Sequence, residues 1–94
     1  MGLSFAWDPA KARRNLAVHG VTFDEASTVF KDPLSVTVED PLHSDDEDRV
    51  ILIGISESLK LLVVVHTDRG DTIRIISARS ATAAEREQYE EHEK

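Results

Sequence analysis

The chain has 94 residues, of which 40% are hydrophobic and 31% charged, and a formal net charge of −7. This length suits a single core, so we expect one domain over residues 1–94. No apolar run approaches the roughly 18 residues of a membrane-spanning helix, and the N-terminus lacks the basic and apolar regions of a signal peptide, which predicts a cytoplasmic protein without membrane contact. The sequence contains no cysteine, which excludes disulfides, thiolate metal sites and cysteine nucleophiles.

The negative charge is unevenly distributed along the chain. Six acids and no base lie between Glu39 and Asp48, whereas residues 49–81 carry a net charge of +2. The overall acidity argues against tight, nonspecific binding to a nucleic-acid backbone, because many basic contacts drive such binding. The overall acidity of the chain is still compatible with a local basic pocket. The acidic segments suit either a solvated surface or the footprint of a basic protein partner.

The N-terminal part predicts a short strand or extended segment at residues 5–7, followed by two helices. An Asp-Pro pair opens the first helix, over residues 9–19, and a glycine follows it; Asp caps free amides, Pro fits the first helical position and Gly accepts a left-handed end. A capping box at Thr22 and Glu25 opens the second helix, which ends near Lys31 before a proline.

The remaining chain predicts strands and a last helix. Apolar and polar residues alternate, or apolar residues run together, over residues 34–38, 50–55, 61–66 and 72–79. The acidic stretch before Asp48 reads as a loop, the connections between the later strands suit antiparallel hairpins, and a further capping box opens a helix from Thr82 to about Glu91. The order predicts an α+β, two-layer domain: two N-terminal helices and a C-terminal helix over one face of a three- or four-stranded antiparallel sheet. The other face must then be covered or polar.

Two arginines, Arg74 and Arg79, lie on or just beyond the last apolar strand. Because arginine keeps its charge and carries a donor fork that matches phosphate, they predict a phosphate site, with RNA as the first ligand to consider. In a regular strand they point to opposite faces, so they meet only if a bulge intervenes or the strand ends near Ser77. The alternatives are structural: Arg74 pairs with an acid on an adjacent strand, and Arg79 caps or bridges to the last helix.

The four histidines show no spacing typical of metal ligands. His66 closes an apolar strand, where it suits either proton exchange near neutral pH or a hydrogen-bonded structural role. His19 lies in the last turn of the first helix, where the helix dipole favours a cation. Lys11, Asn15 and His19 share one side of that helix, and such a polar stripe is usually a solvated face.

Several segments, each weak alone, are specific in their joint order and spacing: Phe5-Ala6-Trp7-Asp8, Lys11, Asn15, His19-Gly20-Val21, Phe23-Asp24-Glu25-Ala26, Val29-Phe30, His43 to Arg49, Gly54-Ile55-Ser56, Leu62 to His66, Arg74-Ile75-Ile76-Ser77-Ala78-Arg79, Glu85, Arg86 and Tyr89. This order resembles the BrnT family, the toxin component of type II toxin–antitoxin pairs in bacteria and archaea. The resemblance covers nearly the whole chain.

The resemblance implies a ribonuclease that inhibits translation, with a fold related to the RelE-type toxins. It also implies a partner, a BrnA-like antitoxin with a ribbon-helix-helix DNA-binding element. The complex would repress its own operon, so operator DNA would be contacted through the antitoxin.

A metal-independent endoribonuclease without a cofactor would use the RNA 2′-hydroxyl to attack the adjacent phosphate. By residue chemistry, we assign phosphate binding and transition-state stabilisation to Arg74 and Arg79, and acid–base catalysis to His66 or His19. We assign substrate contacts to Lys11, Arg49 and Tyr89. The net charge of −7 supports an alternative, in which a catalytically weak or inactive toxin homologue acts as a co-repressor with its DNA-binding antitoxin.

Overall fold

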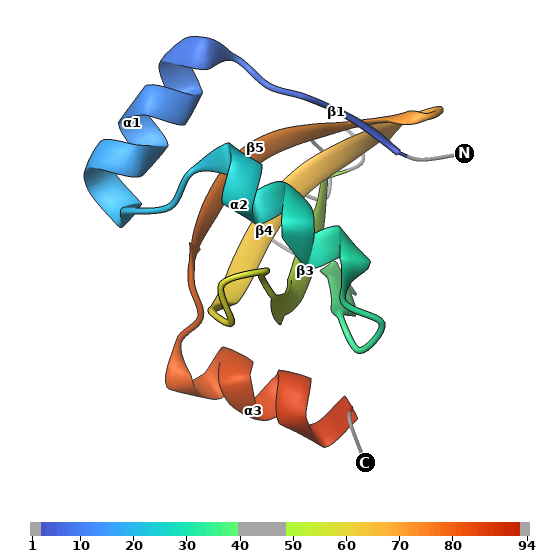
Figure 1. Ribbon diagram of the computed structural model, residues 1–94. Coiled ribbons are helices and arrows are strands. Elements are labelled where there is room, and N and C mark those ends of the chain that lie inside the picture. Colours follow the sequence, from blue (N-terminus) through green and yellow to red (C-terminus); the bar gives the residue numbers. More distant parts are fainter. Residues whose placement is uncertain (1–2, 40–48, 93–94) are drawn as a thin grey trace.

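The computed structural model describes residues 3–39 and 49–92 (Figure 1). The predicted acidic loop at residues 40–48 lies outside this part. The elements follow the order β1 (Ser4–Ala6), α1 (Pro9–His19), α2 (Phe23–Thr28), a 3₁₀ turn η1 (Val29–Lys31), β2 (Val36–Glu39), β3 (Arg49–Ile55), β4 (Leu61–Arg69), β5 (Thr72–Ser80) and α3 (Ala83–His92). None of the helices in these two ranges is long and apolar enough to cross a membrane.

The helix ends are formed by the residues that predicted them. The Asp8 side chain accepts a hydrogen bond from the Ala10 N–H at the start of α1, and Gly20 ends that helix with a φ of 71°. The Thr22 hydroxyl accepts a bond from the Glu25 N–H at the start of α2. These contacts satisfy backbone groups that a helix end leaves unpaired, so both helix starts are determined locally.

The sheet has five strands in the order β1-β5-β4-β3-β2 and is mixed. Strands β2 to β5 form the predicted antiparallel meander, but β1 adds to the free edge of β5 in parallel, with Ser4 opposite Thr72 and Ala6 opposite Arg74. The expectation of a purely antiparallel sheet of three or four strands is therefore wrong. The three residues of β1 are bound through backbone pairing with a strand nearly seventy positions away, which local sequence patterns do not report.

Helices cover both faces of the sheet, which corrects the prediction of one helical layer. Helices α1 and α2 pack on one face, where α2 crosses in front of β4 and β3 (Figure 1), and this core contains Val21, Phe23, Ala26, Val29, Leu52, Leu62, Val64, Ile75 and Ala78. On the other face, α3 contributes Tyr89 to a second core with Val36, Ile53, Leu61 and Val63. Helix α3 packs mainly against β2 and β3, so it covers this second face at one end.

A bulge interrupts the pairing of β4 and β5. Val65 lies opposite Ser77 and His66 lies opposite Ile75, which leaves Ile76 as an extra residue on β5. An inserted residue resets the alternation of side chains along its strand. Residues of β5 on the two sides of Ile76 therefore follow opposite parity.

The bulge brings the two strand arginines to the same face. Arg74 lies opposite Thr67, and Arg79 lies opposite Val63; Thr67 and Val63 are four residues apart on β4 and share the face that α3 covers in part. A bulge was one of the two ways, beside an early end of the strand near Ser77, in which the sequence allowed the arginines to meet. The two arginines are about 13 Å apart along the strand, because they lie opposite residues four positions apart on β4 and each position adds about 3.3 Å.

At Gly54, strand β3 passes close to the helical layer. A Cβ atom at this position would lie 2.8 Å from Cγ1 of Val29 and 3.0 Å from Cβ of Ser35. Val29 is fully buried, so its side chain has no free space to move into. The backbone of β3 can approach η1 this closely because residue 54 has no side chain.

We expect Gly54→Ala to lower the free energy of unfolding by about 1–3 kcal/mol, the usual cost of forcing an extra methyl group into a packed core. Urea unfolding followed by circular dichroism measures this. Gly70→Ala is the control: Gly70 has a φ of 64° but nothing within 4 Å of its Cβ position, so it carries only backbone strain. A Gly54→Ala variant as stable as the wild type would contradict the close approach.

Candidate functional site

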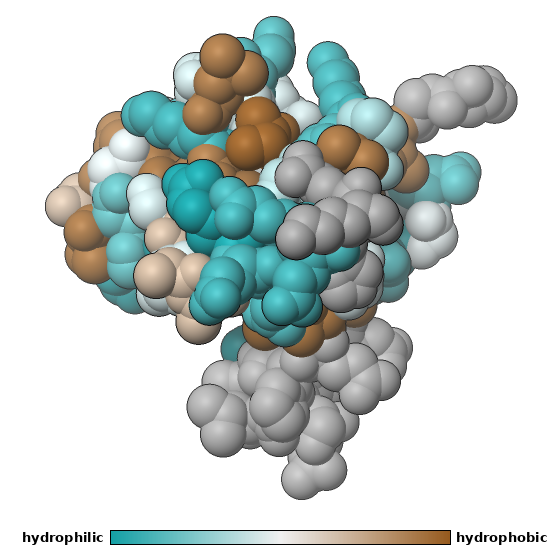
Figure 2. Space-filling model, turned by 90° about the horizontal axis from the view of Figure 1, so that it is seen from below, coloured by the Kyte–Doolittle hydropathy of each residue, from teal (hydrophilic) through white to brown (hydrophobic). Residues whose placement is uncertain are grey.

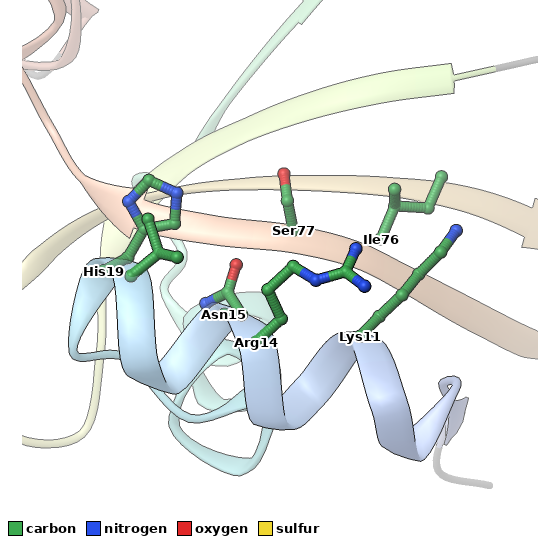
Figure 3. Close-up of a pocket in the computed structure, with 7 residues that line it drawn as sticks. Lys11, Arg14, Asn15, His19, Ile76 and Ser77 are labelled. Atoms are coloured by element: carbon green, nitrogen blue, oxygen red, sulfur yellow. The ribbon is translucent and has the colours of Figure 1, made fainter.

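A hollow of about 300 Å³ lies between α1 and β5. In Figure 3, α1 runs along the strand and its side chains reach over the space between them. We call this hollow the α1–β5 groove; its lining residues are Lys11, Arg14, Asn15, Val18, His19, Ile76 and Ser77.

Helical spacing places the basic residues of the groove on one side of α1. Lys11 and Arg14 are three residues apart, and His19 follows one turn after Asn15, so these side chains neighbour one another on the helix surface. Lys11, Arg14 and His19 are all exposed. Helix α1 contains no acid, so the groove is locally basic in a chain with a net charge of −7.

Asn15 attaches α1 to the edge of β5. Its Nδ2 donates to the carbonyl oxygens of Ala78 (2.8 Å) and Val21 (3.0 Å), and its Oδ1 accepts from the Ala78 N–H (3.1 Å). Strand β1 pairs with β5 only at residues 72–74, so Ala78 has no neighbouring strand on this side. The Asn15 amide takes the place of that strand and fixes the distance between helix and sheet.

The β5 wall of the groove contains the bulge. Ile76, the extra residue, and Ser77 both line the groove, and Ser77 points into the space above the strand in Figure 3. The groove thus presents an ammonium, a guanidinium, an imidazole and a hydroxyl group. This set can bind a phosphodiester and exchange a proton beside it.

Of the predicted site residues, the groove brings together Lys11 and His19. The sequence prediction missed Arg14, although its three-residue spacing from Lys11 would have indicated that both lie on one helix face. It also missed Ser77 as a lining residue, because the bulge decides on which face of β5 this side chain lies.

Arg79 binds a carboxylate of α3. Its Nη1 and Nη2 donate to the two carboxylate oxygens of Glu85 at 2.8 and 2.7 Å. The hydrogen bonds from Arg79, together with those from Thr82, lower the pKa of Glu85 to about 2. This is the bridge to the last helix that the sequence left open as the structural alternative for Arg79.

Tyr89 is only 6% exposed and packs in the second core. Its hydroxyl donates to Oδ2 of Asp32 at 2.7 Å. Burial would raise the pKa of Asp32, but hydrogen bonds from the Ile55 and Leu34 amides and from Tyr89 together lower it. In this position the ring anchors α3 and leaves no face for stacking on a base.

His66 is also buried, with 4% of its surface exposed. Its ring meets Phe30 edge to face, with centroids 4.8 Å apart, and its Nδ1 lies 3.0 Å from a carboxylate oxygen of Asp68. Burial lowers the pKa of His66, and the nearby Asp68 opposes this shift in part. Of the two roles that the sequence left open for His66, these contacts favour a hydrogen-bonded structural role over proton exchange with solvent.

Arg74 and Arg49 lie outside the α1–β5 groove. Arg74 is exposed and Arg49 half-buried, and each lies opposite Thr67 in the sheet register. Among residues 3–39 and 49–92, no acid lies opposite either arginine, so the pairing of Arg74 with an acid across the strands is not seen in these ranges. In the same ranges, no group of three or more His, Asp or Glu side chains could hold a metal ion.

Comparison with known proteins gives a family and a fold. The family model described as "Ribonuclease toxin, BrnT, of type II toxin-antitoxin system" matches residues 7–85. The crystal structure of the Brucella abortus ribonuclease toxin, BrnT, is similar to this chain with a TM-score of 0.67 and 24% sequence identity, over 85% of this chain and 97% of that chain. No curated protein matches. The matched residues include all of α1 and β5.

We expect Glu85→Gln to lower stability at pH 6 by less than about 1 kcal/mol, because the Arg79 side chain is 41% exposed and solvent screens the pair. The folded pKa of Glu85 is about 2, below its ordinary 4.5, so the pair stabilises the protein above pH 4.5 and this stabilisation is lost as the pH falls towards 2. The difference between variant and wild type should therefore shrink in that window. Urea unfolding at a series of pH values measures it, with Glu87→Gln on the same helix as the control. A pH-independent difference would contradict the assignment.

Proposed function

Because the chain belongs to the BrnT family of ribonuclease toxins of type II toxin–antitoxin systems, we propose that it is a metal-independent endoribonuclease that inhibits translation in the cytoplasm. We further propose that the α1–β5 groove holds the scissile phosphate. A BrnA-like ribbon-helix-helix antitoxin neutralises the free toxin, and operator DNA is contacted through that partner.

The observation that carries this proposal is the gathering of Lys11, Arg14 and His19 along one groove of an acidic protein. Charges separated by more than about 8 Å are largely screened at physiological ionic strength, so a phosphate in the groove responds to these three groups more than to the distant acids. Two cations and an imidazole within one short hollow suit binding and cleavage of a phosphodiester.

In the proposed reaction, His19 accepts the proton of an RNA 2′-hydroxyl. The 2′-oxygen then attacks the adjacent phosphorus, a new P–O bond forms, and the bond to the 5′-oxygen of the next nucleotide breaks. The leaving 5′-oxygen takes a proton from water, which the open groove admits. The products are a 2′,3′-cyclic phosphate and a 5′-hydroxyl end, and DNA is not cleaved because it lacks the nucleophile.

Lys11 and Arg14 stabilise the transition state in this scheme. The attacked phosphate gains negative charge on its non-bridging oxygens, and preorganised cations beside those oxygens lower the barrier. The two side chains extend along β5 from the same face of α1 (Figure 3). The Ser77 hydroxyl, on the opposite wall, is placed to donate a hydrogen bond to the same phosphate.

The surface of α3 suits a basic protein partner. The helix has the sequence AAEREQYEEH and exposes Glu87, Glu90 and Glu91. Seen from below, its outward face forms a hydrophilic area in the centre of the molecule (Figure 2). Complementary charge of this kind steers association with a basic antitoxin and leaves the groove on α1 to RNA.

The second candidate function is that of a co-repressor without nuclease activity. The net charge of −7 favours it, because few basic residues are available for binding RNA on the ribosome. It shares the antitoxin partner with the first proposal and differs in one outcome, since an inactive homologue leaves RNA intact and does not arrest growth when it is expressed alone.

We expect the purified chain to cleave a labelled single-stranded RNA in the presence of EDTA. His19→Gln should lower kcat by about 10²- to 10⁴-fold, because a general base is removed. The double variant Lys11→Gln/Arg14→Gln should lower kcat by at least about 10²-fold, because transition-state charge loses its partners. Denaturing gel electrophoresis of the products under single-turnover conditions measures both effects.

Arg13→Gln is the matched control. Arg13 is an exposed arginine on α1 that faces a different hollow, between α1 and α2, so this variant should cleave RNA like the wild type. An intact RNA with the wild-type protein, with and without ribosomes, would instead support the co-repressor. Unchanged cleavage by the groove variants would keep the enzyme and reject the groove as its site.

A further inference from the structure

A row of three side chains crosses the sheet on the face opposite α1 and α2. Arg49 of β3 lies opposite Thr67 of β4, and Thr67 lies opposite Arg74 of β5. Directly opposite residues in an antiparallel sheet have Cβ atoms about 4.5–5.5 Å apart. Thr67 is therefore flanked on both sides by an arginine, and we call these three residues the Arg–Thr–Arg row.

The hydroxyl of Thr67 has no hydrogen-bond partner in the part of the chain that the structure describes. Thr67 is only 4% exposed, and its Oγ1 is buried. An unpaired buried hydroxyl destabilises a folded protein, whereas valine has the same shape and would fill the position without that cost. A threonine at this position suggests that the hydroxyl binds something absent from the free chain.

The two arginines of the row are available to a ligand. Arg74 is exposed and Arg49 half-buried, and neither forms a hydrogen bond or ion pair with residues 3–39 or 49–92. Arg79, on the same face of β5, is occupied by Glu85 of α3. Among the residues that the structure describes, the ion pair of α3 with the sheet is the one to Arg79, so the helix does not neutralise Arg49 or Arg74.

The chemistry of the row selects an oxyanion. It offers two guanidinium forks and one hydroxyl donor, while its members contribute no acceptor other than that hydroxyl. Phosphate matches this set because two arginines can each donate to a different non-bridging oxygen, and the hydroxyl can donate to either. A phosphate bound to the Thr67 hydroxyl would have the guanidinium of Arg49 on one side and that of Arg74 on the other.

The row and the α1–β5 groove meet across β5. Ser77, which lines the groove, lies opposite Val65, and Arg74 lies opposite Thr67, two residues further along β4. Two residues of a strand span about 7 Å. This separation is comparable with one nucleotide step of an extended single strand, so an RNA with one phosphate in the groove can place a neighbouring phosphate at the row.

We propose that Arg49, Thr67 and Arg74 form a second phosphate subsite, which binds an RNA phosphate next to the scissile one. This inference rests on the proposed function, because it takes RNA as the ligand of the groove. In this subsite Arg49 and Arg74 neutralise the phosphate, and the Thr67 hydroxyl gains the partner that it lacks in the free protein. The three residues increase the affinity for RNA without taking part in bond cleavage.

The test uses a fluorescein-labelled 2′-O-methyl oligoribonucleotide, which binds but cannot be cleaved because its 2′-oxygen is blocked. Thr67→Val should raise the Kd for this probe about tenfold, the effect of losing a hydrogen bond to a charged group. The same variant should unfold at the same or a higher temperature than the wild type, because the unpaired hydroxyl is gone. Weaker binding together with undiminished stability separates a ligand-binding role from a structural one.

Two further variants sharpen the result. Thr67→Ser keeps the hydroxyl and should retain most of the affinity. Arg49→Gln/Arg74→Gln should weaken binding and reduce the slope of log K against log salt concentration by about 0.7, the change expected for one lost phosphate contact on a single strand. Thr37→Val, at an exposed position on β2, is the control for the Thr→Val exchange.

Several results would overturn the subsite. The subsite is rejected if the wild type does not bind the probe, or if the Thr67 and arginine variants bind it as tightly as the wild type does. The subsite is also rejected if these variants lose affinity for a polyglutamate peptide and keep their affinity for RNA. Failure of the proposed function is a separate observation: a wild-type protein that leaves cleavable RNA intact, yet binds the blocked probe through the row, lacks nuclease activity and keeps the subsite.

Discussion

The hydrogen bonds between Asn15 and Ala78 are the contact on which the rest of the site depends. A single side-chain amide satisfies both the N–H and the C=O of a strand residue at the sheet edge, and a third bond to Val21 fixes the turn after α1. These groups are buried, so breaking the contact would leave several of them unpaired at a cost of about 1–3 kcal/mol each. Because α1 is attached here, Lys11 and His19 face β5 at a defined distance.

The bulge at Ile76 is the second constraint, and it acts on the same strand. It shifts the alternation of β5, so that Ala78 can face Asn15 while Arg74 and Arg79 share the opposite face. A regular strand would send one arginine into the α1–α2 layer, where the core is apolar. One inserted residue thus creates a polar end on a face that is apolar elsewhere.

Helix α3 forms an ion pair with Arg79 but lies away from Arg74. It is attached through the partly buried Tyr89–Asp32 hydrogen bond and through the ion pair of Arg79 with Glu85. The carboxylate neutralises Arg79, whereas Arg74, about 13 Å along the strand, lies beyond the end of the sheet that α3 covers. An acidic protein can in this way keep a few cations without partners, because ion pairing is local and screening limits the reach of the other charges.

The sequence by itself determined the features that depend on neighbouring residues. Asp8, Thr22 and Gly20 specified the helix ends, because capping involves side chains and amides only a few positions apart. Alternating residues predicted the meander β2–β5, and the order of short motifs indicated the BrnT family. Lys11 and His19 could be assigned to one helix face for the same reason, since helical spacing is a local property.

Only the tertiary structure decided how distant segments meet. The parallel pairing of β1 with β5, the position of α3 on the second face and the bulge at Ile76 all depend on contacts between residues far apart in the chain. The positions of the candidate site residues also depend on such contacts. Tyr89 and His66 are buried in the fold, and the strand register places Thr67 between two arginines. Sequence patterns show which residues prefer a strand or a helix, but strand register and burial follow from packing of the whole chain, which no short segment contains.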